Sequence, residues 1–132
     1  MLTTTQHDIS TDIAPIIERS EVPVLTAMQR QGDVLVRPIR PGLVANLAPI
    51  PPEGIAVVKG EAGGNTHLLQ GDGQFAVSNA PAPSLTLGTL VVGEGETAWL
   101  QHCEHGLTGI GPGSYVMSRQ RQQADIVRMV QD

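Results

Sequence analysis

Residues 85–101, LTLGTLVVGEGETAWLQ, decide the fold class. Two short runs rich in aliphatic residues flank a turn at Gly93-Glu94-Gly95. Apolar runs of this length, separated by glycine-rich turns, are typical of consecutive β-strands. The sequence therefore predicts two strands joined by a tight turn at this place.

The same pattern recurs over most of the chain. Its spacing is typical of sandwiches and small barrels, and no long helical pattern lies between the runs to connect parallel strands. We therefore expect an all-β fold, a jelly roll or cupin-like small barrel, with a β-sandwich as the alternative. The other predicted strands are 33–37, 43–47, 55–59, 67–70, 74–78, 107–110 and 114–121, and 126–130 fits a last strand or a short helix.

The first 27 residues differ from the rest. Four isoleucines between Ile9 and Ile17 recur at helical spacing, and Pro23 ends the pattern. We expect residues 1–27 to form an N-terminal arm with a short amphipathic helix, and residues 28–132 to form a single β domain. Such an arm either packs on its own domain or docks on a neighbour.

Composition excludes several classes of function. The net charge of −5 and the presence of only one lysine, Lys59, argue against nucleic acid as a partner. The only cysteine, Cys103, has no second thiol in the chain to pair with. The sequence shows neither a signal peptide nor a run of about 20 apolar residues, so we expect a cytoplasmic protein with no membrane partner.

Three histidines make the one candidate site. His102 and His105 lie in the string HCEH, on either side of Glu104, and His67 lies upstream. If the strand ends near Gln101 and the string turns, both histidines of the string converge on one place. Imidazole and carboxylate suit Zn²⁺, Fe²⁺, Mn²⁺ or Ni²⁺. The predicted ligands are His67, His102, His105 and Glu104.

Two alternatives weigh against the metal site. Histidines beside turns are often exposed or hydrogen-bonded to the backbone. The order of the residues also differs from the usual cupin motif, since the lone histidine comes first here. If the protein is an enzyme, Glu104 is the candidate general base. The sequence contains no nucleophile motif and no phosphate-binding glycine loop.

A series of motifs spans residues 28–130. The motifs are RQGDVL at 30–35, GE and GNTH between 60 and 67, HCEHG at 102–106, PGSYV at 112–116 and RQR at 119–121. This series resembles a small bacterial family of uncharacterised proteins. That family commonly has His-x-His where this chain has Asn65-Thr66-His67, and its histidine pairs imply a metal or catalytic role. The family begins near Met28, which makes residues 1–27 an added extension.

Two functions follow as hypotheses. The favoured one is a non-enzymatic structural or assembly subunit that self-associates or docks on a partner protein through residues 1–27. The alternative is a cupin-like metal-binding domain, with the possibility of a metal-dependent enzyme acting on a small substrate. The alternative requires His67 to lie close to His102.

Overall fold

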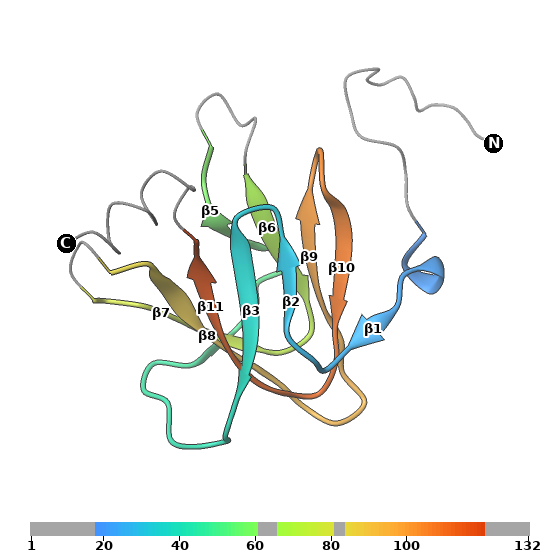
Figure 1. The fold of residues 1–132 in the computed structure, drawn as a ribbon. Coiled ribbons are helices and arrows are strands. Elements are labelled where there is room, and N and C mark those ends of the chain that lie inside the picture. Colours follow the sequence, from blue (N-terminus) through green and yellow to red (C-terminus); the bar gives the residue numbers. More distant parts are fainter. Residues whose placement is uncertain (1–17, 61–65, 81–83, 121–132) are drawn as a thin grey trace.

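The computed structural model describes residues 18–60, 66–80 and 84–120, and these form two β-sheets (Figure 1). A short 3₁₀ helix, η1 (Arg19–Glu21), precedes the strands. The five-stranded sheet has the order β1 (Val24–Leu25), β10 (Gly106–Ile110), β9 (Ala98–His102), β6 (His67–Gly71), β5 (Ile55–Val58). The six-stranded sheet has the order β2 (Gln29–Gln31), β3 (Val34–Ile39), β11 (Gly113–Arg119), β8 (Thr86–Val92), β7 (Gln74–Val77), β4 (Ala48–Pro49).

The architecture is that of a sandwich. Each sheet keeps two edge strands, so over the described residues the strands do not close into a barrel. Neighbouring strands pair antiparallel except for β1 and β10, which are parallel. The all-β prediction is confirmed, and of the two architectures left open by the sequence, the sandwich describes the two sheets.

The core is aliphatic, as the scarcity of aromatic residues requires. Along β8 the burial alternates with a period of two, which is what one buried sheet face produces. Trp99 and Phe75 are also largely buried, and the Tyr115 hydroxyl donates a hydrogen bond to the carbonyl of Gly111 at 2.7 Å. The side chains of the core cluster are Val34, Val36, Ile50, Val58, Leu69, Phe75, Leu90, Val92, Ala98, Leu100, Ile110, Tyr115 and Met117.

The predicted strand positions are wrong in one place and incomplete in another. The prediction at 43–47 is wrong, because that segment contains a turn and the strand lies just after it at β4. Pro49 lies in this edge strand, where a missing N–H is tolerated. Strands β1 and β2 were missed, since runs of two and three residues carry too little periodicity. The predicted arm helix and the segment 126–130 lie outside the described residues.

Part of the predicted arm lies on the domain itself. Strand β1 runs beside β10, where the Gly111 N–H donates to the carbonyl of Leu25 at 2.8 Å. A Cβ added at Gly109 would lie 2.9 Å from the carbonyl oxygen of Pro23. The guanidinium of Arg19 also sits over the Trp99 ring, 5.2 Å from its centroid. Residues 19–25 therefore pack on their own chain.

Candidate functional site

The histidine cluster, defined as His67, His102 and His105, lies at one end of the sandwich. His67 begins β6 and His102 ends β9, and the two are directly paired across the strands. His105 follows in the turn between β9 and β10. The ring of His102 is the middle one, since its centroid lies 4.3 Å from that of His67 and 4.6 Å from that of His105. The closeness that the metal hypothesis required is thus present.

A turn from the other sheet covers the cluster. Gly32 and Asp33 connect β2 to β3, and Figure 1 shows this turn at the same end as the β9–β10 turn. A Cβ added at Gly32 would lie 2.8 Å from Cδ2 of His105 and 3.2 Å from Cε1 of His67. Gly32 also has a φ of +60°, which other residues rarely adopt. Glycine is therefore required for this close approach.

Gln31 fixes the tautomer of His67. The Gln31 side chain is buried, and its Nε2 donates to the carbonyls of Leu100 at 2.7 Å and Gly106 at 3.1 Å. Two carbonyl acceptors identify this end of the amide as the NH₂ group, so Oε1 is the end that faces His67 Nδ1 at 2.9 Å. Since Oε1 can only accept, His67 Nδ1 carries the proton. This network also joins β2 of one sheet to β9 and β10 of the other.

The other nitrogen of His67 faces a carboxylate. Nε2 lies 3.3 Å from Oδ1 of Asp33, and Oδ2 of Asp33 accepts a 2.7 Å hydrogen bond from Nε of Arg119. With the proton on Nδ1, a neutral His67 presents its Nε2 lone pair to a negatively charged oxygen. That contact is repulsive unless a cation, either a proton or a metal ion, lies between the two atoms.

His102 has the opposite tautomer. Its Nδ1 accepts two backbone hydrogen bonds, from the N–H of Glu104 at 3.0 Å and from the N–H of His105 at 3.1 Å. An acceptor at Nδ1 places the proton of the neutral ring on Nε2. These two bonds shape the turn that carries His105, and they occupy one of the two nitrogens through which His102 could bind a metal.

The electrostatics favour the neutral forms of His67 and His102 and an ionised Asp33. Burial lowers the pKa of His67, as does the neighbouring His102, while Asp33 opposes the shift. Burial also lowers the pKa of His102, with a further contribution from His105. Burial alone would raise the pKa of Asp33, but the hydrogen bond and charge of Arg119 outweigh it, and the net shift is downward.

The remaining predicted ligand is Glu104, and its carboxylate makes no described contact with the histidine rings. Its side chain is exposed, and in the described contacts it contributes its backbone N–H to His102. His105 is exposed too, and its ring is nearly parallel to that of His67 at a centroid distance of 6.4 Å. Across residues 18–60, 66–80 and 84–120, no three or more His, Cys, Asp or Glu side chains are already arranged to hold a metal ion.

Sequence reasoning missed Gln31, Asp33 and Arg119 as site residues. All three lie within quoted motifs, Gln31 and Asp33 in RQGDVL and Arg119 in RQR. A polar Gln-Gly-Asp string before an aliphatic run is a usable signal for a hairpin turn. Nothing in the string itself indicates that the turn reaches the other sheet.

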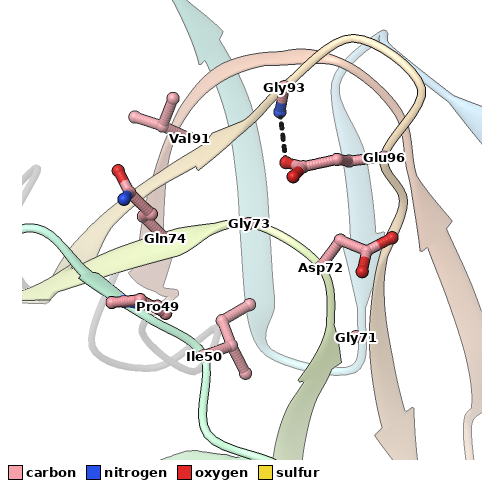
Figure 2. Close-up of a pocket in the computed structure, with 9 residues that line it drawn as sticks. All are labelled: Pro49, Ile50, Gly71, Asp72, Gly73, Gln74, Val91, Gly93 and Glu96. Atoms are coloured by element: carbon pink, nitrogen blue, oxygen red, sulfur yellow. Dashed lines mark hydrogen bonds between the residues drawn. The ribbon is translucent and has the colours of Figure 1, made fainter.

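A pocket of about 400 Å³ lies at the opposite ends of β6 and β9. Figure 2 shows Pro49 and Ile50 on one side and the carboxylates of Asp72 and Glu96 on the other. Both carboxylates are bound by backbone, since Asp72 Oδ2 accepts from Thr97 N–H at 3.3 Å and Glu96 Oε1 accepts from Gly93 N–H at 2.8 Å. These bonds stabilise the turn at 93–96 and connect Asp72 to Thr97.

No helix in the described parts of the chain is long and apolar enough to span a membrane. No curated protein and no solved structure matches the chain. A family model does match, over residues 30–120, which include every side chain of the site just described. The chain belongs to the family Domain of unknown function (DUF8820).

Proposed function

We propose that this protein is a metal-binding domain in which a divalent transition metal ion lies between His67 Nε2 and Asp33 Oδ1. The observation that carries the proposal is the tautomer of His67, whose lone pair faces the carboxylate at 3.3 Å. Two ligand atoms of a tetrahedral ion, each about 2.0–2.1 Å from it, are separated by about 3.3 Å. The pair therefore has the spacing of two metal ligands before the ion is added.

The surroundings of the pair support the proposal. Metal-binding histidines usually donate their second ring N–H to an oxygen, which fixes the ring and directs the free lone pair at the metal. Gln31 Oε1 provides that oxygen for His67. Arg119 holds the second oxygen of Asp33 at 2.7 Å and thereby orients the first.

His105 supplies the third ligand in this proposal. Its ring is exposed and lies beside Gly32, the residue before Asp33, and we propose that rotation of the side chain brings a nitrogen to the ion. This also explains why three ligands do not stand preassembled in the described residues. A mixed imidazole and carboxylate set with open positions suits Zn²⁺, Fe²⁺, Mn²⁺ or Ni²⁺.

The proposed ligands differ from those expected from the sequence. His67 and His105 are kept, while Asp33 takes the place of Glu104. His102 is assigned to the turn, because its Nδ1 already accepts two backbone hydrogen bonds. Ligation through Nε2 would place the proton on Nδ1, against those two N–H groups.

Elemental analysis of variants tests the proposal. We expect Asp33→Asn and His67→Gln to lose the bound metal, and His105→Ala to weaken it. Asp72→Asn is the matched control, since it makes the same change at an exposed carboxylate in the pocket at the other end. Metal content that is unaffected by both Asp33→Asn and His67→Gln would contradict the proposal.

A second candidate function is assembly through residues 1–27, either with further copies of the chain or with a partner protein. The observation that favours it is an exposed apolar edge formed by Val24, Leu25 and Met28, which are 44%, 42% and 60% exposed. Strand β1 is also a sheet edge, which offers backbone groups for pairing. With either function, we propose that the protein is located in the cytoplasm.

Native mass spectrometry tests the assembly role. We expect the full chain to form a discrete oligomer. A chain without residues 1–27 should form an assembly of fewer subunits. A full chain that is monomeric at all concentrations would contradict this role, whatever its metal content.

A further inference from the structure

His102 holds a buried hydrogen-bond donor. The residue is 3% exposed, and both backbone N–H groups of the turn point at Nδ1. Because Nδ1 accepts both bonds, the ring carries its proton on Nε2. Among the described residues no acceptor is bonded to this N–H. A buried donor left without an acceptor is costly.

The charges around this donor suit a negative ligand. Among the described residues, the carboxylate that contacts the cluster, Asp33, is already paired with Arg119. The Arg119 side chain is 55% exposed and uses its Nε for that pair. A divalent ion on Asp33 and His67 makes the site positive overall, with the exposed Glu104 as the nearest opposing charge on the turn.

We propose that a small oxyanion, a carboxylate or a phosphate, binds beside the metal and accepts a hydrogen bond from His102 Nε2. The inference rests on the proposed metal site, because the ion leaves open coordination positions that a ligand oxygen fills. His102 then acts as a positioning residue for the ligand, and its tautomer is set by the turn. The metal and this N–H are the two groups that recognise the ligand oxygens.

Two variants of His102 separate its roles. Asparagine keeps an acceptor near the position of Nδ1 and has no donor at the position of Nε2. Glutamine has an amide NH₂ near the position of Nε2. We therefore expect His102→Asn to keep the turn but to lose the hydrogen bond to the ligand. His102→Gln should keep part of that hydrogen bond.

The experiment is a calorimetric titration of the zinc-loaded protein with acetate and, separately, with inorganic phosphate. We expect one of the two to bind, and His102→Asn to weaken it by about tenfold or more, as loss of a charge-assisted hydrogen bond does. His102→Gln should recover part of the affinity. The zinc content of both variants should match the wild type, and His102→Asn should also keep the wild-type melting temperature.

Three outcomes would overturn the inference. Neither anion binds the zinc-loaded protein, or His102→Asn binds as tightly as the wild type, or His102→Asn loses zinc and so shows His102 to be a ligand. A wild-type protein that takes up no zinc is a different result, because it contradicts the metal site itself. Metal analysis of the same samples tells these failures apart.

Discussion

Gln31 is the residue that sets the tautomer of His67. Its amide bonds to two backbone carbonyls of the opposite sheet and, through Oε1, to the ring of His67. Without the amide, the carbonyls of Leu100 and Gly106 and Nδ1 of His67 would each lose a hydrogen-bond partner, and His67 could adopt either tautomer. Stability and function are therefore coupled at this one side chain.

We predict that Gln31→Leu destabilises the fold by about 2–4 kcal/mol, since several buried polar groups lose their partner at once. Gln101→Leu is the matched control. Gln101 is exposed on β9, so the same change should cost about 0.5 kcal/mol or less. Urea unfolding measures both variants, and equal losses of stability would contradict the role assigned to Gln31.

The pH dependence of the folding stability of the metal-free protein also depends on single residues. The pKa values of His67 and His102 are lowered on folding, so the unfolded chain, with histidine pKa values of about 6.5, takes up protons first as the pH falls. The stability held by these neutral rings is present above pH 6.5 and is lost below it. Asp33, whose pKa is also lowered, acts in the same direction at lower pH.

We therefore predict that the free energy of unfolding of metal-free protein decreases between about pH 7.5 and pH 5. The decrease should be smaller in His102→Asn, which has one fewer titrating ring. Urea unfolding at several pH values provides the test. Stability that rises toward pH 5 would show that the buried rings are charged in the folded state.

The sequence predicted part of the site. The three histidines were identified by residue type and by the turn at 103–105, which ends the strand alternation and lets them converge. Asp33 and Gln31 could not be identified, since their role comes from a hairpin of one sheet lying against two strands of the other. Such a contact depends on the packing of the sheets, which local patterns do not encode.

At the scale of elements, strand β1 decides how the N-terminal segment meets the domain. Its pairing with β10 needs two glycines, because a Cβ at Gly109 would meet Pro23 and Trp99, and one at Gly111 would meet Thr26 and Val24. The sequence shows both glycines, but their purpose appears only when β1 lies beside them. The period-two runs predicted most other strands well, since burial of one sheet face produces that period.

We predict that Gly109→Ala loosens β1 from β10. The added methyl would lie 2.9 Å from the carbonyl oxygen of Pro23 and 3.0 Å from the Trp99 ring, so the segment must shift. The amide of Gly111, which bonds to Leu25, should then exchange with solvent deuterium faster by about tenfold or more. Gly42→Ala, where no atom lies within 4 Å of the new Cβ, is the control. Unchanged exchange at Gly111 would contradict this account of the edge.

At the scale of the whole molecule, the two ends of the sandwich carry different chemistry. One end holds the histidine cluster, the ion pair of Asp33 and Arg119, and Gln31, whose side chain joins the sheets. The other holds the pocket with Asp72 and Glu96, whose carboxylates are tied to backbone N–H groups. The proposed metal site lies at the first end, where the turn at Gly32 and Asp33 of one sheet meets the rings of His67 and His105 of the other.

The most direct test of the metal site is elemental analysis with native mass spectrometry on untagged, freshly purified protein. The account predicts about one divalent transition metal ion per chain, as a single site requires, and its loss in Asp33→Asn. Protein that is isolated without metal and takes up none of Zn²⁺, Fe²⁺, Mn²⁺ and Ni²⁺ would contradict it. In that case the contact between His67 and Asp33 holds no metal ion, and the histidine cluster serves to join the two sheets.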